Sequence, residues 1–245
     1  MLVLVAAVAI ATIISVAVRG DGPSPTSSAG TPSVGEDRGQ SAGLRATAAA
    51  VLSAQPTLPL GASGFTYPIR GGCLPEDDSL MPGAPRAYRR GIHEGVDFYQ
   101  SDNCAVIGLD TDVIAAKAGT VIRADRSYGD LTSETLAELM ERVEENGGDE
   151  VVDAFRGRQV WVDHGNGVVT RYAHLNRIAD SIEVGTQVEA GAVIAYVGES
   201  GTVASVTEPG TQMHLHFEIR VDESYLGQAL DPATARRLYQ RAFSP

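Results

Sequence analysis

The chain has 245 residues, five histidines, two cysteines and a formal net charge of −12 at pH 7. This length fits one large domain or two small ones. Lys and Arg form no dense stripe anywhere in the sequence, so nucleic acid is not an expected partner. The acidic balance itself says little about a substrate.

The N-terminal segment is strongly apolar. Residues 2–18 read LVLVAAVAIATIISVAV, with only two hydroxyl side chains among them. A helix needs roughly 17–25 such residues to cross a bilayer, so residues 1–18 are just long enough for a transmembrane anchor. The alternative is a secretory signal with Ser15-Val16-Ala17 as its cleavage site. Both interpretations place the rest of the chain outside the membrane, either anchored in the cell envelope or secreted.

Residues 19–64 are rich in Gly, Pro, Ser, Thr and Ala. Such a segment lacks the apolar periodicity needed to offset the entropy lost on ordering. We predict a disordered linker over 19–64 and a single domain over 65–245. The two cysteines of this domain are Cys73 and Cys104. One disulfide is the expected state of an exported protein, and two free thiols are the alternative.

Short runs rich in β-branched and aromatic residues recur through the domain: AGTVIRA, RQVWVDHG, GVVTRYAHL, AVIAYVG and MHLHFEIRV. Residues 168–173 alternate in the period of two that is typical of a strand. The segment Asp163–Gly167, DHGNG, predicts a tight hairpin turn, because Asn-Gly favours positive φ. Many short strands with regular turns predict a mainly β domain, either an antiparallel β-sandwich or a partly open barrel.

A small helical insertion is predicted over about residues 130–157. Its apolar side chains fall at i, i+3, i+4 and i+7, which gives one stripe along a helix. They are Leu136, Leu139, Met140 and Val143. Thr132 and Ser133 are capping residues for its start. A second short helix is expected at Asp149–Phe155. The insertion lies between two strands, where it either shapes a substrate cleft or only covers a sheet edge.

Four of the five histidines lie in motifs that together favour a metal site: His93 in GIHEGVD, His174 in RYAHL, and His214 and His216 in MHLHFEI. His214 and His216 of MHLHFEI are two apart, so on a strand they point to the same face. A zinc ion with imidazole bonds of about 2.0–2.1 Å can bind one of them and leave the other over its open position.

A second pair, His93 and Asp97, lies in GIHEGVD. In a straight strand these two would be about 13 Å apart, too far to share an ion. Gly95 between them permits a bend that brings both inward. Two histidines and one carboxylate with an open fourth position form the ligand set of a catalytic zinc.

The sequence resembles the LytM/lysostaphin-type zinc endopeptidases, which cut peptidoglycan cross-links. The resemblance covers residues 67–232 and rests on HEGVD, AKAGTVIRA, VDHGNGVVTRYAHL, VGTQVEAGAVIAYVGESG and MHLHFEI. It implies an antiparallel β core and one zinc ion bound by His93, Asp97 and His216. It also implies that His174 and His214 orient the zinc-bound water and stabilise the oxyanion, and that a peptidoglycan peptide is the substrate.

In such a site zinc lowers the pKa of its water and polarises the scissile carbonyl. His174 or His214 would accept the proton and later protonate the leaving amine. The alternative is a catalytically idle domain that regulates other cell-wall hydrolases. A lipoyl- or biotinyl-type carrier is excluded, because GTQVEAGAVIAYVGESG has no lysine at its hairpin tip.

Other polar residues near these motifs are assigned simpler roles. We expect Glu94 to be solvated and His164 to be structural, and Tyr172 shares the face of His174 without a definite role. The arginines at 86, 89 and 90 are expected to form a solvated basic turn or, alternatively, to bind a substrate carboxylate. The sequence departs from the family pattern before the first ligand, in the lead VTEPGTQM and in the helical insertion, so substrate choice stays open.

Overall fold

The structure is a computed structural model that describes residues 57–145 and 148–244. The predicted anchor or signal at 1–18 and most of the predicted linker lie outside the described residues. Within the two described ranges, no helix has both the length and the hydrophobicity needed to cross a membrane.

Residues 57–64, which form the end of the predicted linker, contact the domain. Ala62 is fully buried. Lys117 Nζ donates to the backbone carbonyls of Gly61 at 2.8 Å and Ser63 at 2.9 Å. The predicted linker therefore overlaps a segment that is packed against the domain.

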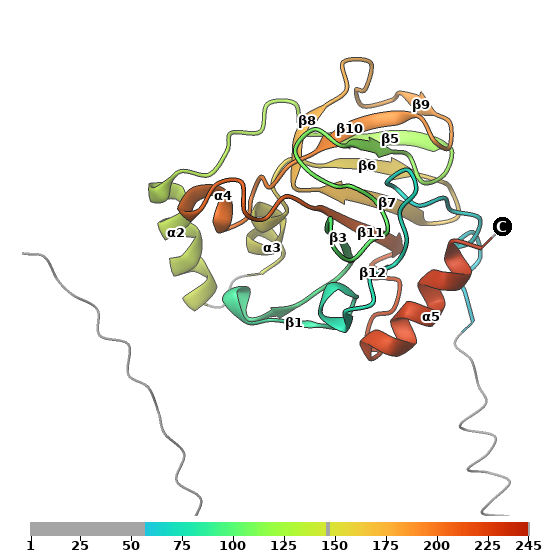
Figure 1. The fold of residues 1–245 in the computed structure, drawn as a ribbon, viewed down its shortest axis with the longest axis horizontal. Helices are drawn as coiled ribbons and strands as arrows, with labels where there is room; N and C mark the ends of the chain where they lie inside the picture. The colour runs from blue at the N-terminus through green and yellow to red at the C-terminus, as the bar shows by residue number, and fades with distance from the viewer. Residues whose placement is uncertain (1–56, 146–147, 245) are drawn as a thin grey trace, which may run out of the picture. The chain divides into compact units, whose positions relative to one another are not determined.

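The main sheet has the strand order β12-β11-β7-β6-β5-β9, and β3 also pairs with β11 (Figure 1). All pairs in it are antiparallel. Its strands are β3 (Val96–Phe98), β5 (Gly119–Ala124), β6 (Val160–Asp163), β7 (Val168–Ala173), β9 (Gln187–Val188), β11 (Leu215–Val221) and β12 (Ser224–Tyr225).

Two smaller sheets complete the described strands, and they are also antiparallel. One has the order β4-β10-β8, and the other is the pair β1-β2. Their strands are β1 (Pro85–Arg86), β2 (Gly91–Ile92), β4 (Asp112–Ile114), β8 (Leu175–Ile178) and β10 (Val193–Val197). The main sheet is open, since within the described part of the chain its two end strands, β12 and β9, do not pair with each other. The predicted mainly β, antiparallel fold is confirmed.

The predicted helical insertion lies between β5 and β6 and consists of α2 (Ser133–Glu144) and α3 (Asp149–Arg156). Thr132 caps α2 by accepting a hydrogen bond from the backbone N–H of Thr135. Buried side chains from the two helices form a small core of their own: Leu139, Val143, Val151 and Phe155. The short helix α4 (Ala204–Thr207) contacts α2 beside them (Figure 1).

The other described helical segments are η1 (Asp78–Leu80) and η2 (Ala87–Arg89), which precede His93, and α5 (Pro232–Ala242), which follows β12. Asp231 caps the start of α5, where Pro232 occupies the first turn. Pro is tolerated there because the first N–H groups of a helix lack intrahelical partners.

Cys73 and Cys104 form a disulfide with Cα atoms 5.5 Å apart, which confirms the predicted pairing. The buried Asn103 strengthens the same junction, because its Nδ2 donates to the Cys73 carbonyl at 2.8 Å. Closing a loop of this length stabilises a fold by roughly 3–4 kcal/mol in the chain-entropy model.

The predicted hairpin turn joins β6 to β7. Asn166 has φ of 53° and Gly167 has φ of 72°. Asp163 Oδ1 accepts a hydrogen bond from the Gly165 N–H at 2.8 Å, as expected for a turn-capping side chain. The turn sets the register in which Asp163 pairs with Val169.

Candidate metal centre

Three neighbouring strands bring the candidate ligands together. β11 lies between β3 and β7 and carries His216. In the antiparallel register His216 is directly opposite Asp97 on β3 and Ala173 on β7. His93 lies in the link between β2 and β3 and is 2% exposed. The centre is therefore built on strand pairing rather than on a long loop.

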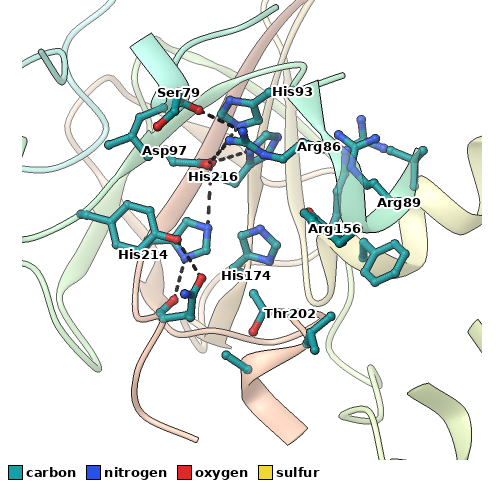
Figure 2. Close-up of a pocket in the computed structure, with 18 of the residues that line it drawn as sticks. Ser79, Arg86, Arg89, His93, Asp97, Arg156, His174, Thr202, His214 and His216 are labelled. Carbon is teal, nitrogen blue, oxygen red and sulfur yellow. Dashed lines mark hydrogen bonds and ion pairs between the residues drawn. The ribbon is translucent and has the colours of Figure 1, made fainter. Parts of the chain in front are cut away.

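The donor atoms of His93, Asp97 and His216 converge on one point (Figure 2). Asp97 Oδ1 lies 2.9 Å from His93 Nε2 and 2.8 Å from His216 Nδ1. The two imidazole nitrogens are 3.0 Å apart. In a tetrahedral site with bonds of about 2.0–2.1 Å, ligand atoms are roughly 3.3 Å apart. A small relaxation of these side chains would therefore match the spacing around one zinc ion.

Hydrogen bonds on the far side of each imidazole fix its tautomer. His93 Nδ1–H donates to the Met81 carbonyl at 3.0 Å, and His216 Nε2–H donates to Glu218 Oε1 at 2.9 Å. The lone pairs of His93 Nε2 and His216 Nδ1 consequently face Asp97 Oδ1. Three lone pairs aimed at one point suit a bound cation, and an outer carboxylate on a ligand histidine is typical of zinc sites. The donor set fits zinc.

The protonation preferences of these groups differ. Burial alone would raise the pKa of Asp97, but interactions with His93 and His216 hold it well below its ordinary value. Burial lowers the pKa of His93 to about 4, so this imidazole is neutral at pH 7. Burial also opposes a charge on His216, yet the protonated ring can donate hydrogen bonds to both Asp97 and Glu218, and this raises its pKa. His216 is thus the ligand at which a proton competes most with a metal.

His174 and His214 lie beside the ligand cluster (Figure 2). Their ring centroids are 4.5 Å apart, and those of His174 and His216 are 5.8 Å apart. His214 forms an isolated β-bridge to Gly198 just before β11. His174 joins β7 to β8 with φ of 59°, a left-handed conformation that is uncommon for residues other than glycine. This bend turns the imidazole towards the centre.

Both of these imidazoles are also held in one tautomer. His174 Nδ1–H donates to the Ser200 carbonyl at 2.9 Å, and His214 Nδ1–H donates to the Gln212 carbonyl at 2.6 Å. Each Nε2 therefore carries the lone pair, and His214 Nε2 is 3.9 Å from Asp97 Oδ1. Burial is the largest cause that lowers the pKa of His174 and that of His214. Neutral imidazoles of this kind can accept a proton at pH 7.

Tyr99 is a neighbour of the site that sequence analysis missed. Its ring stacks on His214 with centroids 4.3 Å apart, and its hydroxyl donates to Gln212 Oε1 at 3.2 Å. Burial raises its pKa, so the phenol stays protonated at neutral pH. The only pattern that could have indicated it is its position two residues after Asp97.

Arg86 does not belong to a solvated basic turn. Its side chain is 14% exposed, and its Nη2 donates to Asp97 Oδ2 at 2.8 Å. Nη1 of the same guanidinium donates to the Ser79 carbonyl at 2.9 Å. This contact occupies one carboxylate oxygen of Asp97 and leaves Oδ1 for the histidines. Arg90 instead pairs with Glu144 on α2.

The expectation that Glu94 is solvated is wrong. Its Oε2 accepts from Arg156 Nη2 at 2.6 Å and from Arg220 Nη1 at 2.7 Å, and its side chain is 25% exposed. The two arginines come from distant elements, α3 and β11. Only the tertiary fold brings them there.

The chain bends at Gly95, as predicted, and glycine is also needed there for a second reason. It is not among the residues with positive φ. A Cβ atom at this position would lie 2.4 Å from the Phe217 carbonyl oxygen and 2.9 Å from His216 Cε1. Glycine allows β3 and its lead to approach β11 closely enough for Asp97 and His216 to meet.

Tyr172 and His164 lie away from the centre. Tyr172 is fully buried, and its hydroxyl accepts from the Ala116 N–H at 2.8 Å. His164 Nδ1–H donates to the Ala118 carbonyl at 2.8 Å, and its Nε2 lies 2.8 Å from Thr170 Oγ1. These contacts agree with a structural role for His164 and give Tyr172 a place in the core.

A groove of about 520 Å³ opens beside the histidines. The helical insertion contributes Val152 and Phe155 to its wall, and the turn into α4 contributes Val203. Tyr88 meets Phe155 edge-on, with ring centroids 5.3 Å apart. The insertion therefore shapes the groove instead of only covering a sheet edge.

The model of Peptidase family M23 matches residues 91–232. A search of curated proteins gave no match. Similar solved structures include a putative peptidase M23 from Pseudomonas aeruginosa, at 24% identity over 83% of this chain and 61% of that chain, with a TM-score of 0.40.

Two further structures are similar. A zinc-containing peptidase from Vibrio cholerae is 21% identical over 66% of this chain and 38% of that chain, with a TM-score of 0.42. The catalytic domain of the antimicrobial peptidase lysostaphin from Staphylococcus simulans is 23% identical over 64% of this chain and 88% of that domain, with a TM-score of 0.39. This chain thus matches less than two thirds of the Pseudomonas and Vibrio proteins.

The family match covers more than half of the chain and includes the whole stretch from His93 to His216. The converging donors and the two further histidines all lie inside it. The chain belongs to Peptidase family M23.

Proposed function

We propose that this protein is a zinc-dependent endopeptidase that acts on peptidoglycan peptides. The observation that carries the proposal is the convergence of His93 Nε2, Asp97 Oδ1 and His216 Nδ1, with each donor held in place by a partner outside the cluster. An N₂O donor set with room for a fourth group is typical of catalytic zinc.

The chain's own residues divide the work around this centre. When bound, zinc supplies a Lewis acid that polarises a peptide carbonyl and activates water. Nε2 of either His174 or His214 accepts the proton of the attacking water and returns it to the leaving amine. Their backbone hydrogen bonds keep the required tautomer, and their burial keeps them neutral.

Family membership and the resemblance to the lysostaphin type support this substrate class. The groove supports a peptide substrate, since it runs along the histidines and has an apolar wall on the insertion side. We place the protein in the cell envelope, anchored through residues 1–18 or released by cleavage after them. The Cys73–Cys104 disulfide supports an oxidising compartment of this kind.

The decisive experiment is digestion of purified peptidoglycan by the full-length chain, with and without a chelator. Mass spectrometry should find new amine termini that disappear with chelator and return with added zinc. Stoichiometric zinc without new amine termini would overturn the enzyme proposal and favour a regulator of other cell-wall hydrolases. N-terminal sequencing of the protein isolated from cells distinguishes an anchor from a cleaved signal.

A further inference from the structure

The last residue of helix α3, Arg156, reaches from the insertion into the surroundings of the metal centre (Figure 2). Its side chain is 9% exposed. Nε donates to Glu218 Oε1 at 2.6 Å, and Nη2 donates to Glu94 Oε2 at 2.6 Å. One guanidinium therefore joins a carboxylate of β11 to the carboxylate next to His93.

Glu218 links this contact to a candidate ligand. The oxygen that accepts from Arg156, Oε1, also accepts from His216 Nε2–H at 2.9 Å. Glu218 is fully buried, and a buried carboxylate needs a cation beside it. Two hydrogen bonds therefore connect Arg156 of the insertion, through Glu218, to the His216 imidazole that faces Asp97.

Two other arginines lie near Glu218, but they contact its other oxygen. Arg220 Nη1 is 3.3 Å and Arg171 Nη1 is 3.7 Å from Oε2. Among the described residues, Arg156 is the cation that the structure places on Oε1. Glu218 Oε1, the oxygen that fixes the tautomer of His216, is therefore positioned by Arg156 more than by Arg171 or Arg220.

The backbone at the same helix end holds a second histidine. The Arg156 carbonyl accepts from the His174 N–H at 2.9 Å. Gly157 follows with φ of 67°, and a Cβ there would lie 2.2 Å from the Ser200 carbonyl oxygen. That same oxygen accepts from His174 Nδ1–H. The end of α3 and the His174 contacts therefore share one closely packed junction.

We propose that Arg156 is a positioning residue for the metal ligand His216, acting through Glu218, and that the helical insertion is part of the support of the metal centre. This inference rests on the proposed zinc function and deepens it. Removal of outer-shell partners of ligand histidines typically weakens metal affinity by about 10–100-fold. A loss of this size is the expected consequence of removing the Arg156 guanidinium.

The test uses the full-length chain with Arg156→Met, Arg156→Lys and the control Arg171→Gln. Zinc dissociation constants come from competition with a chelator, and Co²⁺ absorption spectra report the ligand geometry. Arg156→Met should raise the zinc dissociation constant by about 10–100-fold and alter the Co²⁺ spectrum. Arg156→Lys should recover part of the affinity, because one ammonium cannot reproduce both arginine contacts. Arg171→Gln should stay within about threefold of the unmodified chain, since its contact to Glu218 is long.

Thermal unfolding in chelator separates this role from a purely structural one. A lower melting temperature for Arg156→Met with an unchanged zinc dissociation constant would overturn the proposal. If Arg156→Met fails to fold, Arg156→Lys replaces it in the test. An unchanged zinc affinity and Co²⁺ spectrum for Arg156→Lys would then overturn the proposal. If the Arg156 variants show these shifts while the unmodified chain binds zinc but cleaves no peptidoglycan, the proposed function is overturned and the role of Arg156 stands.

Discussion

His216 on β11 lies directly opposite Asp97 on β3, and its Nδ1 is 2.8 Å from Asp97 Oδ1. The two side chains meet because the strands that carry them are paired, although 119 positions separate them in the chain. Sites built on strands are held more rigidly than sites on loops. The pair therefore gives the centre a fixed starting geometry.

The first prediction separates the two histidines of the MHLHFEI strand. His216→Ala should lose zinc, because it removes one of three donors. His214→Ala should keep zinc and reduce turnover by about 10²–10⁴-fold, the usual contribution of a general acid or base. Metal analysis of each purified variant and peptidoglycan digestion give the two readouts. Release of zinc by His214→Ala would show that this division of roles is wrong.

The second prediction concerns the backbone of His174, which has φ of 59°. His174→Gly and His174→Val should both lose turnover, because neither can transfer a proton. Glycine adopts this conformation freely, whereas a β-branched residue is strained there by about 1–3 kcal/mol. Denaturant unfolding should therefore find the valine variant less stable than the glycine variant. Equal stabilities would contradict this account of the bend between β7 and β8.

The third prediction is a pH dependence of zinc affinity. The pKa of His216 lies above its ordinary value, so protons compete with the metal as the pH falls through that raised pKa. His93, whose pKa is about 4, begins to compete only in more acidic solution. Below the His216 pKa, zinc binding should release close to one proton, so the zinc affinity should fall by about tenfold for each unit of pH. Chelator competition at a series of pH values measures this slope, and a flat profile down to about pH 5 would refute it.

The fourth prediction tests the close approach at Gly95. Gly95→Ala places a methyl group against the Phe217 carbonyl, so β3 and β11 must move apart. We expect a loss of about 1–3 kcal/mol in unfolding free energy, together with weaker zinc binding. Gly129→Ala is the matched control, because a Cβ there has no atom within 4 Å and the residue is not among those with positive φ. Zinc binding by Gly95→Ala at the unmodified level would rule out this role of the glycine.

The alternating and helical patterns in the sequence were sufficient to predict part of the secondary structure around the site, whereas the short elements β1, β2 and α4 were not predicted. Period-two alternation predicted β7, and the apolar stripe with Thr132 before it predicted α2. The Asp163–Gly167 turn follows from Asn-Gly chemistry. These features depend on residues close in the chain, where backbone preferences and side-chain spacing act directly. The five candidate site residues could be chosen for the same reason, since each lies in a short motif.

The supporting contacts could not be predicted from the sequence. Arg86, Arg156 and Glu94 were expected to be solvent-facing or were not considered, yet each makes a partly or fully buried ion pair. A charged residue on a short segment gives no local sign that it will be buried with a partner. Arg156 and Glu218 are 62 positions apart, and only the tertiary fold brings the end of α3 to β11.

The sequence by itself determined the chemical types of the donors and the strands and turns that carry them, because those depend on local spacing and on the elements available to each motif. The tertiary structure alone decided which nitrogen of each histidine faces the centre, which oxygen of Asp97 faces the histidines, and how Glu218 links the insertion to His216. Tautomer and orientation depend on hydrogen-bond partners from distant segments. Strand register and helix packing place those partners, and no local pattern in the chain encodes them.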